Sequence, residues 1–278
     1  MKQLIITQKV SYLILFKRKI INLAGKIIYK LYQKYYYNNI GSYTFHESEL
    51  SVKELEAAVK YVDEGAIVDY KIELNRVNIE NTSQYYPYKL ILKKEKGDPL
   101  ELNICNIGCF YAGADAHFLK NNPNCTVYGL DFGNLDKFNS DIFSNNLKLY
   151  SGYPLNTIKS MVNENKITFD YAFFVRTAVK INIEQLESYI KYLSQISKNI
   201  IFLENAKLSE SHSKHVNVSK IPLNNPLKLY GGMYLHNYME LLIKYGYEIE
   251  EYKIIEANNF NNNLTPDHDF IFVSGIKK

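Results

Sequence analysis

The amino-acid sequence predicts an α/β fold built on one mostly parallel β-sheet. Beyond residue 99, short apolar runs alternate regularly with helical stretches, which is typical of parallel strands with helices on both faces. The first of these runs, at 102–107, leads into a loop that contains glycines and then into a helix. With 278 residues and 46% hydrophobic content, the chain is long enough to bury a full core.

The expected elements follow from this pattern in order. Residues 47–64 place apolar side chains at helical spacing, and 78–88 is predicted to be a loop. A turn at 96–99 separates this leading region, 47–98, from a domain predicted at 99–278. In that domain the expected strands span 102–107, 126–131, 147–151, 171–175, 200–204, 247–255 and 270–274, and the expected helices span 115–121, 155–163, 183–197 and 233–245.

Positive charge is concentrated at the N-terminus. The chain carries a net charge of +4, but residues 1–46 hold eight Lys or Arg and no Asp or Glu, which leaves 25 basic against 29 acidic residues in the rest. The predicted domain is therefore mildly acidic, which argues against a nucleic-acid-binding protein with a basic surface throughout. We expect residues 1–46 to form a helical N-terminal appendage.

This appendage is predicted to contain a basic amphipathic helix. Apolar residues recur at helical spacing from Ile21 to Tyr35, and lysines fall on the opposite side. One interpretation is that residues 1–37 make peripheral contact with an anionic membrane surface. The other is that the helix packs on the domain or on a second subunit, with its lysines in solvent.

The sequence favours a cytoplasmic protein. The apolar run at 10–16 is much shorter than the roughly 20 residues that span a bilayer, and positive charges follow it, whereas an export signal has them first. Cys105, Cys109 and Cys125 lie in one short stretch without the spacing of a disulfide framework or a metal site. The membrane interpretation would place the protein at the inner face of the membrane.

The strand at 102–107 and the loop after it form the motif with the clearest chemical meaning. Gly108 and Gly113 allow a ligand to approach the backbone closely, and the following helix offers unpaired N–H donors at its N-terminus. The next strand ends at Asp131, whose carboxylate can accept hydrogen bonds from two adjacent ribose hydroxyls. This order of strand, loop, helix, strand and acid is typical of the nucleoside-binding half of a Rossmann-like fold.

From this motif onward the sequence resembles the class I S-adenosylmethionine-dependent methyltransferases, including those of surface-polysaccharide pathways. The family's first motif reads acid-x-Gly-x-Gly-x-Gly, and the matching positions are Asn106, Gly108, Phe110 and, one residue out of step, Gly113. The resemblance covers about residues 85–278. It implies S-adenosylmethionine as the cofactor.

The resemblance also implies an antiparallel hairpin at the end of the sheet and a role for each strand end. The loop after the first strand would pass under the methionine part of the cofactor, and Asp131 would hold the ribose. Residues after the second and third strands would contact the adenine, and those ending the fourth would face the methyl group. The implied cofactor-binding residues are Asn106, Gly108, Cys109, Gly113, Asp131, Phe132, Gly152, Tyr153 and Val175.

Two departures from the family pattern keep other functions open. Asn106 stands where the family has an acid, and Phe110 stands where it has the middle glycine. A catalytically degenerate scaffold subunit is therefore an alternative. An NAD(P)-dependent oxidoreductase is a further alternative, although it would be expected to show a complete Gly-x-Gly-x-x-Gly motif and a second βαβαβ half.

His236 and Arg176 are the candidate catalytic residues. A hydroxyl acceptor must lose a proton, and His236 at the start of the last helix could take it, or it could be an ordinary half-buried histidine. Arg176 could bind a phosphate or carboxylate of the acceptor, or form a structural ion pair. His212 and His215 lie in a long connection that could cover a substrate.

No metal site is expected. Glu204 and Asn205 resemble the acid-Asn pair that binds a divalent cation in catechol-type methyltransferases, but Arg176 stands where a partner acid is needed. We expect the methyl group to go to an oxygen of a sugar or other small acceptor. This expectation rests on the basic N-terminal segment and on the resemblance, and the oligomeric state is left open.

Overall fold

The computed structural model describes residues 79–96, 99–109, 112–132, 145–165, 167–206, 217–228, 234–256, 259–260 and 269–278. The predictions for the segment 1–46, for the helix at 47–64 and for His212 and His215 lie outside these ranges. Phe110 also lies outside them.

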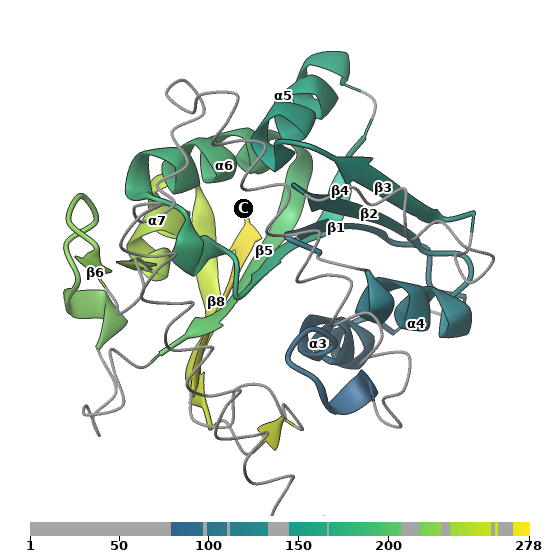
Figure 1. Ribbon diagram of the computed structural model, residues 1–278, viewed down its shortest axis with the longest axis horizontal. Coiled ribbons are helices and arrows are strands. Elements are labelled where there is room, and N and C mark those ends of the chain that lie inside the picture. The colour runs from purple at the N-terminus through teal and green to yellow at the C-terminus, as the bar shows by residue number, and fades with distance from the viewer. Residues whose placement is uncertain are drawn as a thin grey trace, which may run out of the picture. The chain divides into compact units, whose positions relative to one another are not determined.

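Strands and helices alternate along the chain (Figure 1). The helices are α3 (Tyr86–Lys94), α4 (Gly113–Asn121), α5 (Pro154–Glu164), α6 (Ile183–Ile196) and α7 (Tyr238–Lys244), with short 3-10 helices η1 (Ile79–Asn81), η3 (Ala178–Lys180) and η4 (Val218–Lys220). The strands are β1 (Asn103–Ile107), β2 (Thr126–Asp131), β3 (Leu147–Ser151), β4 (Phe169–Val175), β5 (Ser197–Asn205), β6 (Leu227–Lys228), β7 (Tyr234–Leu235), β8 (Tyr247–Ile255) and β9 (Phe270–Lys277).

Seven of these strands form one sheet in the order β3-β2-β1-β4-β5-β9-β8. Strands β1 to β5 pair in parallel, whereas β9 is antiparallel to both β5 and β8. The predicted fold class is confirmed: a mostly parallel, Rossmann-like sheet that ends in an antiparallel hairpin. Because the five parallel strands run the same way, their carboxyl ends meet at one edge, called here the carboxyl edge; the opposite edge is the amino edge.

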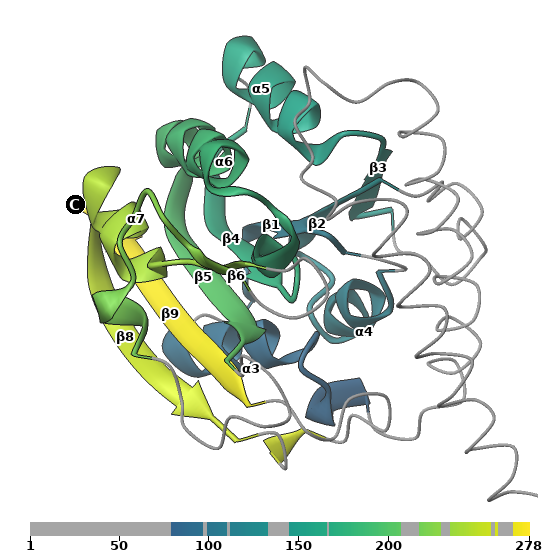
Figure 2. The ribbon, with the colours of Figure 1, turned by 60° about the vertical axis from the view of Figure 1, so that its left-hand side comes forward.

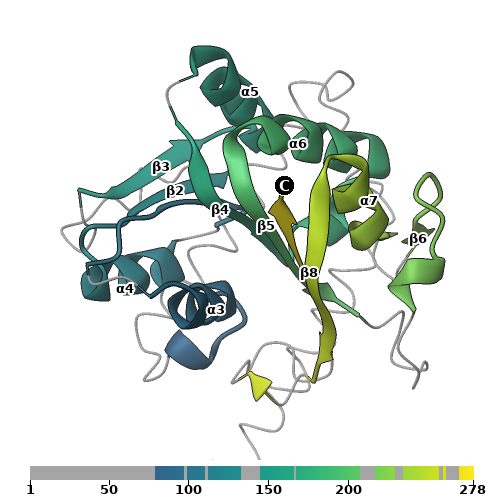
Figure 3. The ribbon, with the colours of Figure 1, turned by 180° about the vertical axis from the view of Figure 1, so that it is seen from behind.

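Helices cover both faces of the sheet (Figure 2). Helices α5, α6 and α7 pack on one face, in a core that includes Phe174 and Phe202. Helices α3 and α4 pack on the other face, around Phe173 and Leu203. Neighbouring residues such as Phe173 and Phe174 enter different cores because side chains alternate across a strand. Figure 3 shows the same two layers from behind.

Local sequence explains where the helices begin. The side chain of Asn182 accepts a hydrogen bond from the Gln185 amide at 2.9 Å and caps α6. Helices α3 and α5 have a proline in their first turn, where a missing N–H does no harm. Within the part of the chain that the structure describes, no helix has the length and apolar character to cross a membrane.

The structure corrects two local predictions. The expected loop at 78–88 contains η1 and the start of α3. The expected helix at 233–245 begins only at Tyr238, because β7 pairs with β6 just before it. Asn237 fixes that boundary: its side chain accepts from the Glu240 amide at 3.1 Å and donates to the Ile221 carbonyl at 2.9 Å.

Candidate functional site

The structure brings most of the predicted site residues to neighbouring strand ends at the carboxyl edge. Backbone hydrogen bonds extend the strand pairing past the last strand residues. Gly108 donates to the Leu130 carbonyl at 2.8 Å, Gly152 to the Asp131 carbonyl at 3.0 Å, and Arg176 to the Leu203 carbonyl at 2.9 Å. The loops after β1, β2, β3 and β4 therefore leave the sheet side by side, in the order of the strands.

The loop after β1 requires a glycine at position 108. Gly108 has φ +76°, in the left-handed region that favours glycine. A Cβ atom there would lie 2.2 Å from Oγ1 of Thr177, which belongs to the loop after β4. Cys109 is buried, with its Sγ 2.9 Å from where a Cβ on Gly129 would lie. The glycines thus let the β1 loop pack against both neighbouring strands.

Helix α4 starts directly after this loop. Ala112, which precedes its first residue Gly113, has φ +55°, an uncommon conformation for a residue with a side chain. Its amide donates to the Cys109 carbonyl at 3.0 Å, which closes the turn. The N-terminus of α4, with its partial positive charge, therefore starts at the carboxyl edge beside β1.

Acidic and aromatic groups follow β2 and β3. Asp131 ends β2 and is 5% exposed. Phe132 and Tyr153 come from the two adjacent strand ends, and their rings meet edge to face with centroids 4.7 Å apart. Gly152 precedes Tyr153 with φ +109°. These groups form one acidic and aromatic corner of the edge.

A hydrogen-bond cluster that sequence reasoning missed lies beside the β1 loop. Asp115, in the first turn of α4, is 0% exposed. Its Oδ1 accepts a hydrogen bond from Asn106 Nδ2 at 2.8 Å and another from the Tyr88 hydroxyl of α3. Burial raises the pKa of Asp115 to about 6, although the two hydrogen bonds act in the opposite direction. The end of β1 therefore lies beside a buried ionisable group, the Asp115 carboxyl, to which Asn106 donates a hydrogen bond.

The loop after β4 is held by Glu204, the penultimate residue of β5. Its buried carboxylate accepts hydrogen bonds from the amides of Thr177 at 3.1 Å, Ala178 at 2.8 Å and Val179 at 3.4 Å. Burial raises its pKa to about 7 against these hydrogen bonds. Arg176, just before them, has φ +54°. Glu204 thus acts here as an anchor for the Arg176 loop.

Lys180, at the end of η3, is a second charged group that the sequence analysis did not select. Its side chain is exposed, yet the protein around it and then the positive charge of Arg176 lower its pKa, while Asp131 and Glu204 oppose that shift. A lysine five residues after β4 carries no motif, so only the fold identifies it. Arg176 and Lys180 give the carboxyl edge a positive side next to the acidic corner.

His236 lies between β7 and α7, two residues before the helix that was expected to contain it, and is 0% exposed. Its Nε2 lies 2.9 Å from the carbonyl oxygen of Ile181. Since a carbonyl only accepts, Nε2 carries the proton and Nδ1 is the basic nitrogen. Burial lowers the pKa of His236 to about 4, so the ring is neutral at pH 7.

No protein-family model matches the sequence, and no curated protein matches it either. The structure is similar to magnesium protoporphyrin IX methyltransferase from Synechocystis PCC 6803 with bound S-adenosylhomocysteine: the TM-score is 0.51 at 10% identity, over 81% of this chain and 99% of that one. It is also similar to human N-acetylserotonin methyltransferase in complex with S-adenosylmethionine, with a TM-score of 0.51 at 11% identity over 88% of this chain and 65% of that one. This chain therefore has the fold of the class I S-adenosylmethionine-dependent methyltransferases.

Proposed function

We propose that this protein is an S-adenosylmethionine-dependent methyltransferase that acts on a small acceptor. The observation that carries the proposal is the combination of a strand order ending in an antiparallel hairpin with a glycine loop after β1 and an acid at the end of β2. A dinucleotide-binding oxidoreductase has six parallel strands in the order 3-2-1-4-5-6. Here antiparallel β9 stands next to β5, where the sixth parallel strand would be.

The residues at the carboxyl edge fit the three parts of this cofactor. Asp131 offers a carboxylate to the ribose hydroxyls, and the rings of Phe132 and Tyr153 offer an apolar surface to the adenine. In this proposal, the β1 loop around Gly108 and Cys109, with the N-terminus of α4, holds the amino-acid part. Val175 ends β4 beside this loop, within reach of the methyl group in the proposed arrangement.

S-adenosylmethionine supplies a methyl group that is bonded to a cationic sulfur. When the methyl group is transferred, the sulfur keeps the bonding electrons and becomes a neutral thioether. The protein's part is to hold the acceptor atom in line with that bond, so positioning accounts for much of the rate. In this proposal Arg176, held by the Glu204 anchor, binds an acidic group of the acceptor. His236 has a neutral ring, but a pKa of about 4 makes it a weak base, and its use as a base requires the acceptor to reach a side chain that is covered in this structure.

The test of the cofactor is calorimetric titration of the full-length protein with S-adenosylhomocysteine. We expect the wild type to bind and the Asp131→Ala variant to bind at least about tenfold more weakly, because a carboxylate that accepts two hydroxyls is lost. Asp170→Ala is the matched control, since Asp170 lies in the same sheet at the amino edge. A folded wild type that does not bind would support the degenerate scaffold, and binding of a nicotinamide dinucleotide instead would support the oxidoreductase.

The acceptor in this proposal is an oxygen atom of a sugar or another small molecule. Arg176 and Lys180 are two positive side chains near the expected methyl position, and they favour an acceptor with an acidic group. Transfer of labelled methyl to matched neutral and acidic sugars tests this preference. Equal labelling of both, or stronger labelling of the neutral sugar, would contradict it.

Membrane contact through residues 1–37 remains a separate hypothesis. The basic amphipathic pattern in that segment motivates it. We expect the full chain to sediment with vesicles that contain anionic lipid. Removal of residues 1–37 should abolish this sedimentation. If the shortened protein sediments equally well, membrane contact through this segment is wrong.

A further inference from the structure

The buried carboxylate of Asp115 has an unequal set of hydrogen bonds. Oδ1 accepts from both Asn106 and Tyr88. Among the residues that the structure describes, no donor reaches Oδ2, although that atom is also buried. A buried polar atom without a partner is costly, and a buried negative charge calls for a positive one. An acid of this kind beside a ligand loop is complementary to a cation.

The surroundings of Asp115 strengthen that interpretation. Tyr88 stacks on Phe118 with ring centroids 4.4 Å apart and meets Phe173 edge to face at 5.2 Å, so its hydroxyl is fixed in place. No ion pair to a described Lys or Arg holds the carboxylate. The thiols of Cys105 and Cys109 are nearby, and burial raises the pKa of each, so they stay neutral and add no charge beside Asp115.

The hydrogen bond from Asn106 to Asp115 also determines how the Asn106 amide is turned. A carboxylate only accepts, so the amide nitrogen must face Asp115, and the amide oxygen faces away from it. Asn106 is the residue before the last one of β1, two positions before Gly108. Its oxygen is an acceptor backed by a negative charge, which makes it a better partner for a cation than an isolated amide.

We propose that Asn106 and Asp115 together bind the ammonium group of the amino-acid half of S-adenosylmethionine. Asn106 provides the acceptor oxygen, and Asp115 is a positioning residue that turns the amide and supplies the charge. The contact and the charge thus come from two different residues: the neutral Asn106 on β1 makes the contact, and the acid Asp115 on α4 carries the charge. This inference rests on the proposed function, since it assumes that cofactor.

A purely structural role predicts a different result. If the cluster only joins α3 and α4 to β1, then removing its charge should weaken every ligand of the site to the same extent. If it binds the ammonium group, only ligands that carry that group should be affected. S-adenosylhomocysteine carries it, and 5′-methylthioadenosine has the same adenosine and sulfur but lacks the amino-acid end.

The experiment is calorimetric titration of the full-length protein with both ligands. For Asp115→Asn we expect S-adenosylhomocysteine to bind at least about tenfold more weakly and 5′-methylthioadenosine to bind as in the wild type. Asp131→Asn should weaken both ligands, because both contain the ribose. Asp170→Asn at the amino edge should change neither.

A swap of the two side chains provides the sharpest comparison. The double variant Asn106→Asp and Asp115→Asn keeps one acid and one amide in contact, so it should regain most of the preference for S-adenosylhomocysteine. Tyr88→Phe removes one hydrogen bond but no charge and should keep the preference. If Asp115→Asn does not fold, the swap and Asn106→Ala carry the test, and Asn106→Ala should lose the preference.

Three outcomes would overturn the inference. A folded Asp115→Asn variant could bind S-adenosylhomocysteine as tightly as the wild type, or it could lose affinity equally for both ligands. Likewise, Asn106→Ala could keep the wild-type preference for S-adenosylhomocysteine. A wild type that binds neither ligand would overturn the proposed function as well, so the two failures are distinguishable.

Discussion

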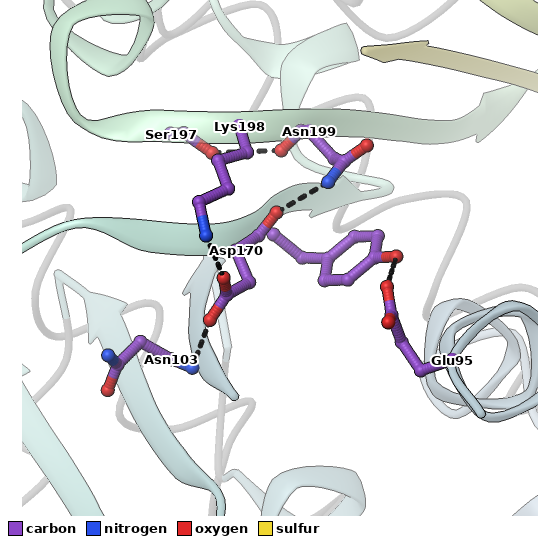
Figure 4. Close-up of polar contacts among 7 residues, drawn as sticks. Glu95, Asn103, Asp170, Ser197, Lys198 and Asn199 are labelled. Carbon is purple, nitrogen blue, oxygen red and sulfur yellow. Dashed lines mark hydrogen bonds and ion pairs between the residues drawn. The ribbon is translucent and has the colours of Figure 1, made fainter. Parts of the chain in front are cut away.

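Two aspartates, one at each edge of the sheet, show how differently the edges use their polar groups. At the amino edge, both carboxylate oxygens of Asp170 have partners (Figure 4): Lys198 donates to one at 2.7 Å and the Asn103 amide to the other at 2.9 Å. Near the carboxyl edge, Oδ1 of Asp115 takes two donors and Oδ2 none among the described residues. Asp170 is satisfied by the fold, whereas Asp115 is not.

The surroundings of the two aspartates differ in the same way. At the amino edge, the Asn199 side chain donates to the Asp170 carbonyl at 2.8 Å (Figure 4). The Tyr171 hydroxyl donates to Glu95. The carboxyl edge has left-handed residues with side chains, Ala112 and Arg176, and two buried acids with raised pKa values. Perturbed pKa values and backbone strain gather at functional sites. In the proposed function, the amino edge serves stability and the carboxyl edge binds the cofactor.

The largest effect is expected from a side chain at Gly108. Gly108→Ala should lower the free energy of unfolding by about 3 kcal/mol. The new Cβ would clash with Thr177, and the backbone at position 108 has φ +76°, which a residue with a side chain rarely adopts. Gly275→Ala is the control: a Cβ there would meet the end of the Leu242 side chain at 3.0 Å and the Cβ of Tyr247 at 3.2 Å, which are milder contacts than at Gly108, so about 1 kcal/mol is expected. Urea unfolding of both variants measures the difference.

A second change should partly restore Gly108→Ala. Adding Thr177→Ala removes the two nearest clashing atoms, Oγ1 and Cγ2, and leaves only Cβ at 2.9 Å, so the double variant should lose less stability than Gly108→Ala alone. If the two changes simply add, the packing between the β1 and β4 loops is not the cause, and this part of the comparison fails.

Glu204 provides the next largest effect, through pH. Its pKa is about 7 in the folded protein and near 4.5 when unfolded, so its contribution to stability is fully present below pH 4.5 and is lost as pH rises through 7. Glu204→Gln removes this dependence. The wild type should therefore lose stability relative to the variant as the pH rises. Between pH 5 and pH 8, the difference in the free energy of unfolding, variant minus wild type, should increase by about 2 kcal/mol. Parallel pH curves would show that Glu204 is not a buried acid of raised pKa.

Sequence reasoning predicted the sheet well because the signal is local. Strands β2, β3 and β8 have the predicted bounds, since each apolar run is bounded by polar or turn residues. Strands β4 and β5 are longer than predicted at their amino ends, where Asp170 and Asn199 are polar. The Asn199 side chain donates a hydrogen bond to the Asp170 carbonyl and so joins the two strands, which no single stretch of sequence reveals.

The candidate site was less predictable because its key contacts join distant residues. Asp115 reads as an ordinary acid in the first turn of a helix, where negative charge is favoured in any case. Its burial depends on Tyr88, in a region predicted to be a loop. Glu204 reads as half of a metal-binding pair, but its partners are backbone amides more than twenty residues away. The roles of the predicted residues His236 and Arg176 remain predictions.

The pH dependence of ligand affinity sharpens the comparison further. With the pKa of Asp115 at about 6, a proton competes with the ammonium group at low pH, so the wild type should bind S-adenosylhomocysteine about tenfold more weakly at pH 5 than at pH 7.5. Burial keeps Tyr88, Cys105 and Cys109 neutral over this range. Calorimetry on Asp115→Asn should show a flatter profile, and an equally steep one would assign the titration to another group.

The smallest effect is expected from Asp170→Asn at the amino edge. The substitution removes the charge from the ion pair with Lys198, whose side chain is 64% exposed, so little stability depends on that pair. The hydrogen bond from the Asn103 amide at 2.9 Å can persist to the new carbonyl. Urea unfolding should show a loss of about 1 kcal/mol, and the affinity for S-adenosylhomocysteine should not change. A variant that keeps its stability but loses the ligand would contradict the division between the edges, since Asp170 lies at the opposite end of β4 from the proposed site.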